Sequence, residues 1–473
     1  MIKPRLAPLL WLFLFYSSSA AAQSWQDTVR AIEAIFVRYK PENPGCELAI
    51  SRNGRVIYSK AWGIADLEHH SQMTTTSITE AGSVSKQFTA AAILLLEQQG
   101  KLSINDDVRK YIPELPDYGH PILLKYMMHH SSGLRDWGAI ATLAGWPRTT
   151  KTYNNNDALD IITHQQRLNN KPNDVFIYSN SNYNLFAIIV ERVSGMSLAD
   201  FTREYIFKPA GMTYTTWRDN HKRVVPDRAI AYALNEGAYE TNIPNEDVYG
   251  NDGLLTTAED LLKWNAYYLS GRFGKPSLLS KQLTTEALND GKDNLYGAGL
   301  FIGHKFHQTY INHSGATASY RAFLSAYPDQ QMSFAWLSNT SAFDGSTNIV
   351  QKVEDLFFEK IKQDTVRVQD VVEMHPPSLQ EAGLQPYEGK YYSDEVQAGF
   401  TVLLKDGNLY LYRSPQTMIE LYPAPHKDHF ATGHPGFSGE RGEIVFVPGT
   451  DGRIKEMLIT IDRAIDVSFA RLP

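Results

Sequence analysis

The chain has 473 residues, of which 43% are hydrophobic and 21% are charged. This composition indicates a globular protein that is long enough for two cores. The formal net charge of -7 is modest for this length, so it gives no reason to expect a nucleic acid as a partner.

The N-terminus has the pattern of a secretory signal. Lys3 and Arg5 precede an apolar run over residues 6–16, and Ala20-Ala21-Ala22 offers a cleavage site. The run is too short to span a bilayer comfortably, so we expect residues 1–22 to be removed and no stable membrane span to remain. The mature protein is then periplasmic or secreted. An uncleaved anchor is the alternative.

The next elements are a helix over residues 25–39 and a hairpin. The stretch CELAISRNGRVIYSKAWG alternates apolar and polar residues around Asn53-Gly54, a strong signal for a two-residue turn. Cys46 is the only cysteine of the chain, so an internal disulfide is excluded.

A second helix is predicted in EAGSVSKQFTAAAILLLEQQGKL, residues 80–102. Its apolar residues recur at helical spacing from Phe88, and Gly100 marks its end. Ser83 and Lys86 are three residues apart and share a face of the first turn. One interpretation is a capping serine beside a solvated lysine. The other is a nucleophile beside its base, which requires burial or nearby cations to destabilise the lysine charge.

Two further motifs carry candidate catalytic groups. Tyr178-Ser179-Asn180 precedes an amphipathic helix, where a phenol can relay a proton and an amide can hold a substrate carbonyl. A tyrosine that only packs at a helix entrance is the alternative. The similar Tyr153-Asn154-Asn155 is expected to lie in a polar loop. His313-Ser314-Gly315 follows a strand-like run, and Gly315 allows a close backbone approach to a substrate.

The chain divides into two predicted domains. Residues 23–365 combine outer strands with helices between them and a closing helix over residues 348–362, which predicts an α+β domain with an antiparallel sheet flanked by helices. Residues 366–386 resemble a linker. Residues 387–473 contain short alternating strands, which predicts an all-β barrel or sandwich. This second domain has no cluster of nucleophile, base and acid, so we expect it to be a scaffold or to restrict the substrate.

No metal ion or other cofactor is expected. Metal-binding and phosphate-binding motifs are absent from the sequence, and His426 and His429, although spaced like ligands, lack a third ligand nearby. We interpret them as a solvated pair.

The three motifs, in this order, resemble those of the serine β-lactamase and penicillin-binding-protein superfamily, specifically its class C β-lactamase-like branch. That branch pairs Ser-x-x-Lys with Tyr-x-Asn, and many members have His-x-Gly in place of Lys-Thr-Gly. The segments MMHHSSGLRDW and YGNDGLLTTAEDLLKW also look like family segments. The C-terminal region is similar to the β-domain appended to many β-lactamase-related hydrolases.

The resemblance implies a role for each candidate residue. Ser83 would be the nucleophile, and Lys86 and Tyr178 would move the protons. Asn180 would orient the substrate amide, while His313 and Gly315 would line the site. The backbone N–H groups of Ser83 and Ala316 would form the oxyanion hole.

The implied function is an exported serine hydrolase that forms an acyl-enzyme on an ester or a D-amino-acid peptide or amide. The partner is then a small-molecule or peptide substrate, with a cell-wall fragment as one option. A β-lactamase or D-Ala-D-Ala carboxypeptidase is the nearest alternative, and a non-catalytic acyl-binding sensor is an alternative of another class. Because His313 is expected to be mostly neutral at pH 7, we predict weak turnover of carboxylate-bearing β-lactams, unless Arg321 supplies the missing charge.

Overall fold

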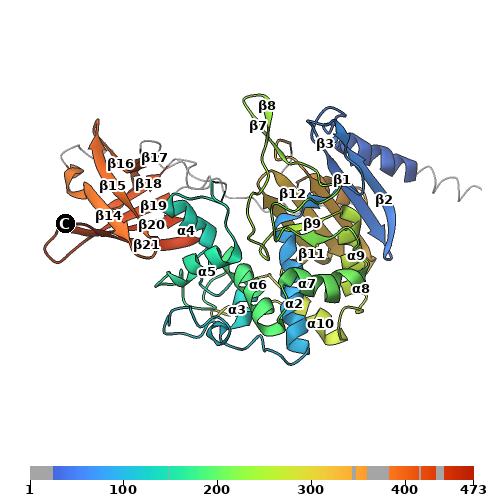
Figure 1. Cartoon of the computed structure of the whole chain (residues 1–473), viewed down its shortest axis with the longest axis horizontal. Coiled ribbons are helices and arrows are strands. Elements are labelled where there is room, and N and C mark those ends of the chain that lie inside the picture. The colour runs from blue at the N-terminus through green and yellow to red at the C-terminus, as the bar shows by residue number, and fades with distance from the viewer. Residues whose placement is uncertain (1–24, 149, 344–347, 359–382, 415–416, 433–441) are drawn as a thin grey trace, which may run out of the picture.

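The computed structural model describes residues 25–148, 150–343, 348–358, 383–414, 417–432 and 442–473. It contains a larger α+β domain and a closed β-barrel (Figure 1). The predicted α+β domain and the predicted all-β domain are both confirmed, and the all-β domain is a barrel and not a sandwich. The predicted signal at residues 1–22 and most of the predicted linker at residues 366–386 lie outside the described residues.

The larger domain is built on one antiparallel sheet in the order β10-β11-β12-β13-β1-β2. The strands of this sheet are β1 (Cys46–Arg52), β2 (Arg55–Trp62), β10 (Phe301–Lys305), β11 (Gln308–Thr317), β12 (Tyr320–Tyr327) and β13 (Met332–Ser338). The predicted hairpin is the pair β1–β2. Its turn residues Asn53 and Gly54 have φ of 54° and 71°, values that Asn and Gly tolerate well.

Both faces of this sheet are buried. Successive side chains of a strand point alternately into a core on one face and into a second core on the other face. Ala49 of β1 belongs to the core around α2, whereas Leu48 and Ile50 belong to a core on the other face. That second core includes the first helix, at residues 25–35, and α11 (Asn348–Glu354). The first helix ends before the predicted residue 39, with a turn over residues 36–38. The end of the predicted closing helix, residues 359–362, lies outside the described residues.

Helices form the rest of the larger domain. They are α2 (Lys86–Gln98), α3 (Leu124–Met128), α4 (Trp137–Ala144), α5 (Asn155–Thr163), α6 (Asn180–Ser194), α7 (Leu198–Thr202), α8 (Lys208–Ala210), α9 (Ala258–Leu269) and α10 (Pro276–Leu283). Short strands join them: β3 (Ile64–Asp66), β4 (Ser71–Gln72), β5 (Thr79–Glu80), β6 (Thr216–Trp217), β7 (Tyr232–Asn235), β8 (Ala238–Thr241) and β9 (Leu254–Thr256). Helix α2 is buried on every side from Lys86 to Leu96, so it is the central helix of the domain.

The barrel is closed by pairing of its first and last strands, β14 and β21. Its strands are β14 (Gly389–Ser393), β15 (Ala398–Lys405), β16 (Asn408–Ser414), β17 (Thr417–Pro423), β18 (His429–Thr432), β19 (Gly442–Pro448), β20 (Ile454–Ile461) and β21 (Ala464–Arg471). Burial alternates along β20 and most of β21, as expected when one face of each strand fills the barrel interior.

The barrel docks on helix α4, which lies between the barrel and the rest of the larger domain (Figure 1). Ala139, Ile140 and Leu143 of α4 belong to the same apolar cluster as the barrel interior. Arg135 and Glu395 form an ion pair of 2.8 Å across this contact, with side chains only 1% and 8% exposed. The two domains therefore share part of one core.

Across the described part of the chain, we find no helix that is both long enough and apolar enough to cross a membrane.

Candidate active site

Ser83 lies in a short 3-10 helix, η1 (Gly82–Ser85), that packs directly against strand β11. The contact depends on two glycines. A Cβ added to Gly315 would lie 2.0 Å from the carbonyl oxygen of Ala81, and one added to Gly82 would lie 2.6 Å from the backbone nitrogen of Ala316. Gly82 also has a φ of 50°, which glycine adopts without strain. The two glycines thus bring the backbone beside Ser83 up to the backbone of Ala316.

The edge of β11 at this point faces η1 because the neighbouring strand is too short to reach it. Strand β10 begins at Phe301, which pairs with Asn312, so it does not extend alongside the later residues of β11. Ala316 lies beyond that end and is exposed. Its N–H and that of Ser83 can therefore face one ligand oxygen, as an oxyanion hole requires.

Lys86 is the first residue of α2, and its side chain is completely buried beside Ser83. Its Nζ lies 3.0 Å from Ser83 Oγ, 2.9 Å from Asn180 Oδ1 and 2.7 Å from the carbonyl oxygen of Asn251. Burial lowers the pKa of Lys86 well below its ordinary value, and the cation of Arg463 lowers it further against the opposing effect of Asp252.

The three contacts of Lys86 match the needs of a neutral amine. Asn180 Oδ1 and the Asn251 carbonyl can only accept, so they take the two N–H groups that a neutral amine has. In the neutral amine the lone pair is left for Ser83 Oγ, 3.0 Å away, whose hydroxyl would donate to it, whereas an ammonium would donate to all three oxygens. Lys86 is thus arranged to withdraw the proton of Ser83.

Tyr178 lies next to this pair, at the entrance to α6. Lys86 Nζ is 4.8 Å from the centre of its ring, and its hydroxyl oxygen is buried. Burial raises the pKa of Tyr178, whereas the nearby Ser83 hydroxyl and the Arg463 cation lower it. Within the described ranges the Tyr178 hydroxyl has no hydrogen-bond partner, so Ser83 is a close neighbour and not a bonded partner. The Tyr178 hydroxyl can therefore exchange a proton with a bound substrate.

Asn180 is fixed at both its backbone and its side chain. Its backbone N donates to Asp136 Oδ2 at 2.7 Å, and its Oδ1 accepts from Lys86. With Oδ1 occupied, the Nδ2 group is the part of the amide that can donate to a substrate carbonyl.

His313 is buried and neutral. Its Nδ1 lies 2.6 Å from the carbonyl oxygen of Ser314, so Nδ1 carries the proton and Nε2 accepts from the hydroxyl of Tyr296 at 3.0 Å. Burial, followed by the nearby Lys86, lowers the pKa of His313 to about 3. The side chain therefore contributes no positive charge to the site at neutral pH.

Arg321, which the sequence offers as a replacement charge, is engaged locally. Its Nη1 donates to the carbonyl oxygens of Ala318 at 2.9 Å and Tyr320 at 2.8 Å. These bonds hold the guanidinium against its own turn.

The structure brings the predicted residues together and excludes Tyr153. Ser83, Lys86, Tyr178, Asn180 and His313 form one connected group. Tyr153 does not lie in a polar loop, as the sequence suggested. It is 2% exposed, its ring packs on Trp137, and its hydroxyl donates to the carbonyl oxygen of Trp146. Asn154 next to it caps α5.

Several residues of the site are missing from the sequence-based prediction. Asn251 and Asp252 come from the loop before β9, and Asp136 precedes α4. Their signal is present in YGNDG and SGLRDW, where polar residues stand in segments without amphipathic spacing. Arg463 comes from the turn between β20 and β21 of the barrel, 5.6 Å from the centre of the Tyr178 ring. No motif in the sequence points to it, and the expectation that this domain is a scaffold or restricts the substrate did not include a residue beside Tyr178.

A polar cleft of about 400 Å³ opens beside Ala316. Arg148 lines it, but its charge is balanced by Glu246 and by Asp252, whose Oδ2 lies 2.7 Å away. The complete lining is Arg148, Thr241, Asn242, Ile243, Pro244, Asn245, Glu246, Ala316, Thr317 and Ala318. This cleft is where a substrate bound to the oxyanion hole would extend.

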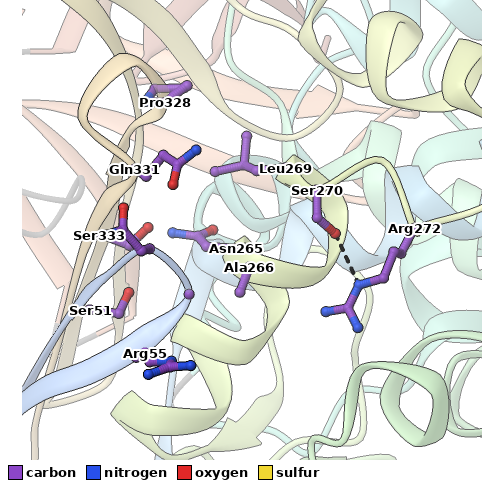
Figure 2. Close-up of a pocket in the computed structure, with 12 residues that line it drawn as sticks. Ser51, Arg55, Asn265, Ala266, Leu269, Ser270, Arg272, Pro328, Gln331 and Ser333 are labelled. Atoms are coloured by element: carbon purple, nitrogen blue, oxygen red, sulfur yellow. Dashed lines mark hydrogen bonds between the residues drawn. The ribbon is translucent and has the colours of Figure 1, made fainter.

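A second cavity, of about 490 Å³, lies elsewhere (Figure 2). Figure 2 shows it between the β1–β2 hairpin, the C-terminal end of α9 and the turn after β12, with Arg55 and Arg272 at its border. None of the predicted catalytic residues lines it.

Among the described residues, the grouped side chains that could bind a metal ion lie outside the candidate site. Asp66, Glu68 and His69 have ligand atoms within 4.8 Å of one another, but Asp66 is bonded to His69 and to the backbone of this turn. The rings of His426 and His429 are 5.7 Å apart, and His429 Nδ1 pairs with Glu443.

The sequence and the fold of this chain are similar to those of known proteins. The sequence matches the family model described as Beta-lactamase over residues 26–354. It is 27% identical over 398 residues to Penicillin-binding protein 4* of Bacillus subtilis (strain 168), covering 80% of this chain and 86% of that protein.

Solved structures share the fold. The octameric penicillin-binding protein homologue from Pyrococcus abyssi has a TM-score of 0.63 and 22% identity, over 94% of this chain and 100% of the other. The D-amino acid amidase from Ochrobactrum anthropi SV3, complexed with D-phenylalanine, has a TM-score of 0.60 and 20% identity, over 70% of this chain and 99% of the other.

Proposed function

Because this chain belongs to the Beta-lactamase family, we propose that it is an exported serine hydrolase that forms an acyl-enzyme on Ser83. The observation that carries the proposal is the set of contacts at Lys86, which leaves the lone pair of a neutral amine directed at the Ser83 hydroxyl. A serine becomes a strong nucleophile when such a base takes its proton.

The reaction runs in two halves. In the first, Ser83 Oγ attacks the substrate carbonyl carbon while its proton passes to Lys86, and the N–H groups of Ser83 and Ala316 hold the oxyanion. The bond to the leaving group breaks as Tyr178 gives its proton to that group and takes the proton that Lys86 received, so both side chains return to their starting states. In the second half, Lys86 takes a proton from the water that attacks the acyl-enzyme. That proton then passes to Ser83 Oγ as the ester bond breaks, and the free acid leaves with Ser83 regenerated.

The substrate we propose is an ester or a D-amino-acid peptide or amide, with a cell-wall fragment as one natural form. Support comes from the polar cleft beside Ala316 and from the neutral state of His313. A cation in place of His313 would attract a carboxylate by about 1 kcal/mol in water and about 4 kcal/mol near a protein surface. Without that attraction, substrates that lack a carboxylate at this position are favoured.

The test is covalent labelling followed by kinetics. Intact-protein mass spectrometry after incubation with a fluorophosphonate should show one adduct on Ser83, and none in Ser83→Ala with its fold intact. A β-lactam panel and a neutral nitrophenyl ester then separate the activities. Efficient turnover of β-lactams would identify a β-lactamase, and an acylation burst without turnover would identify a sensor. Labelling of the Ser83→Ala variant would overturn the proposal.

Export is part of the proposal and rests on the pattern of residues 1–22. N-terminal sequencing of the protein from its native host tests it. A mature chain that begins near residue 23 is the expected result, and an intact N-terminus in the cytoplasm would contradict it.

A further inference from the structure

The turn between β20 and β21 carries a barrel residue into the hydrolase site. The backbone of this turn is held by the larger domain at several points. The carbonyl oxygen of Arg463 accepts from the N–H of Asp136 at 3.2 Å and from Asn169 Nδ2 at 2.9 Å. Asn169 Oδ1 in turn accepts from the N–H of Ile465 at 2.8 Å. The position of the turn is therefore fixed by hydrogen bonds to the hydrolase domain.

The side chain of Arg463 lies among groups that the reaction uses. Its guanidinium carbon is 5.6 Å from the centre of the Tyr178 ring, within the range of a cation–π contact. Its Nη1 is 3.6 Å from Asp136 Oδ2, the oxygen that accepts from the backbone N–H of Asn180. Arg463 thus contacts Tyr178 directly and Asn180 through Asp136.

The docking of the barrel does not explain this placement. The barrel is already attached through the buried Arg135–Glu395 pair and through the apolar cluster on α4. These contacts attach the barrel without Arg463, so its placement over Tyr178 is not required for docking.

We propose that Arg463 is a positioning residue of the hydrolase site, by which the docked barrel holds Tyr178 and the Asp136–Asn180 contact in their working arrangement and favours proton transfer from Ser83. This inference rests on the proposed function and assigns the barrel a part in it.

The charges around Lys86 and Tyr178 support this role. Among the described residues, Arg463 and Arg148 act on the pair as cations and Asp136 and Asp252 act as anions, while buried His130 and His313 pack against the Tyr178 ring. Arg148 is bonded to Asp252 and Glu246. Burial raises the pKa of Asp136, and Arg463 is the strongest influence that brings it below its ordinary value. Arg463 lowers the pKa of both Lys86 and Tyr178, so its loss would leave both groups harder to deprotonate.

The experiment compares the pH dependence of Ser83 labelling in the full-length wild type, Arg463→Gln, Arg463→Lys and Arg413→Gln. Arg413 is the matched control, because it also reaches from the barrel to α4, where it donates to the carbonyl oxygen of Leu143. For Arg463→Gln we expect the rising limb of the labelling rate to move up by about one pH unit, and the rate at pH 7 to fall about tenfold. Arg463→Lys should recover most of this loss, and Arg413→Gln should match the wild type.

The outcomes distinguish a failure of the role proposed for Arg463 from a failure of the proposed hydrolase function. An unshifted limb in Arg463→Gln, with wild-type labelling on Ser83, would overturn the role of Arg463 and leave the hydrolase standing. A rise in KM only for carboxylate-bearing esters, with no shift of the limb, would also overturn it by making Arg463 a substrate-binding residue. If the glutamine variant fails to fold, Arg463→Met, which keeps an unbranched side chain but removes the charge, takes its place in the comparison with Arg413→Gln, and an unshifted limb there would overturn the role of Arg463. Wild-type protein that is not labelled on Ser83 would overturn the proposed function itself.

Discussion

At the residue scale, the chemistry depends on how many hydrogen-bond donors a side chain retains after its contacts within the protein are made. Lys86 donates two N–H groups to Asn180 Oδ1 and to the carbonyl oxygen of Asn251, and both of these atoms can only accept. The unprotonated form thus satisfies all of its contacts, whereas a protonated amine would carry a buried charge. Burial favours the unprotonated form of Lys86 and so leaves its nitrogen able to accept a proton from Ser83.

Tyr178→Phe should lower kcat for a nitrophenyl ester by about a hundredfold to ten-thousandfold, because only the proton-carrying hydroxyl is lost. The melting temperature should hold, since the Tyr178 hydroxyl has no hydrogen-bond partner within the described residues. Tyr153→Phe is the control with the opposite pattern. It removes a hydrogen bond to Trp146, costs about 1 kcal/mol of stability and should keep full activity. Equal losses of activity in the two variants would show that Tyr178 carries no proton.

Because His130 is buried with a lowered pKa, we expect the protein to lose stability in acid. It is completely buried, its Nδ1 accepts from the N–H of Ser179 and the amide of Asn182, and burial followed by the nearby Lys86 lowers its pKa well below the ordinary 6.5. The folded state therefore stays neutral where the unfolded state binds a proton, so the free energy of unfolding falls as the pH drops below 6.5.

His130→Asn should remove about 1 kcal/mol of the fall in unfolding free energy between about pH 7.5 and pH 5.5. An asparagine can offer an acceptor near Nδ1 and tolerates the φ of 55° at this position. Urea unfolding at the two pH values measures the change, with exposed His120→Asn as the control. A wild-type protein that is equally stable at both pH values would contradict the prediction.

At the scale of elements, the oxyanion hole is a packing feature of η1 on β11. Gly82 and Gly315 remove the side chains that would keep the helix and the strand apart. The strand β10 stops short and leaves the edge of β11 to this contact. The N–H groups of Ser83 and Ala316, which we propose hold the oxyanion, are thus brought together because Gly82 and Gly315 have no side chains.

Gly315→Ala should reduce kcat by at least about a hundredfold, because its Cβ would lie 2.0 Å from the carbonyl oxygen of Ala81 and would push η1 away from β11. Gly303→Ala on β10 is the matched control, since an added Cβ there meets nothing within 4 Å. Steady-state kinetics on the nitrophenyl ester measures both. Wild-type kcat in Gly315→Ala would mean that the two N–H groups are not held by this contact.

At the scale of the whole molecule, the barrel and the hydrolase domain behave as one body because polar and apolar contacts join them. Arg135 donates to Glu395, and its other nitrogen donates to the carbonyl oxygens of Ile465 and Asp466. Glu395 also accepts from the N–H of Gln166 at 2.7 Å. The turn that carries Arg463 adjoins these contacts, so firm docking and the geometry of the site are coupled.

Glu395→Ala should destabilise the protein by about 3–5 kcal/mol, because it leaves Arg135 buried without its anion. We expect a single calorimetric transition in the wild type and a lower, split transition in the variant. Glu443→Ala, which removes an exposed barrel carboxylate paired with His429, should be close to neutral. A wild-type melting curve for Glu395→Ala would show that the two domains are stable independently of this pair.

Much of the fold could be predicted from local patterns. The Asn53-Gly54 hairpin, the helix after Ser83 and the alternating strands of the second domain are all encoded by residues close together in the sequence. The main local error has a physical reason. Tyr153 is packed by Trp137, a contact that no short-range pattern reveals.

The sequence by itself determined the fold class and the candidates Ser83, Lys86, Tyr178, Asn180 and His313, because their motifs are short and keep fixed spacing. Only the tertiary structure decided the protonation states of Lys86 and His313. Burial is a property of all the elements that surround a group, and it makes Lys86 a base and His313 a neutral hydrogen-bonding residue. Only the tertiary structure, too, brought Arg463 to Tyr178, since residues 285 positions apart meet through the docking of two domains and not through any repeat or spacing in the chain.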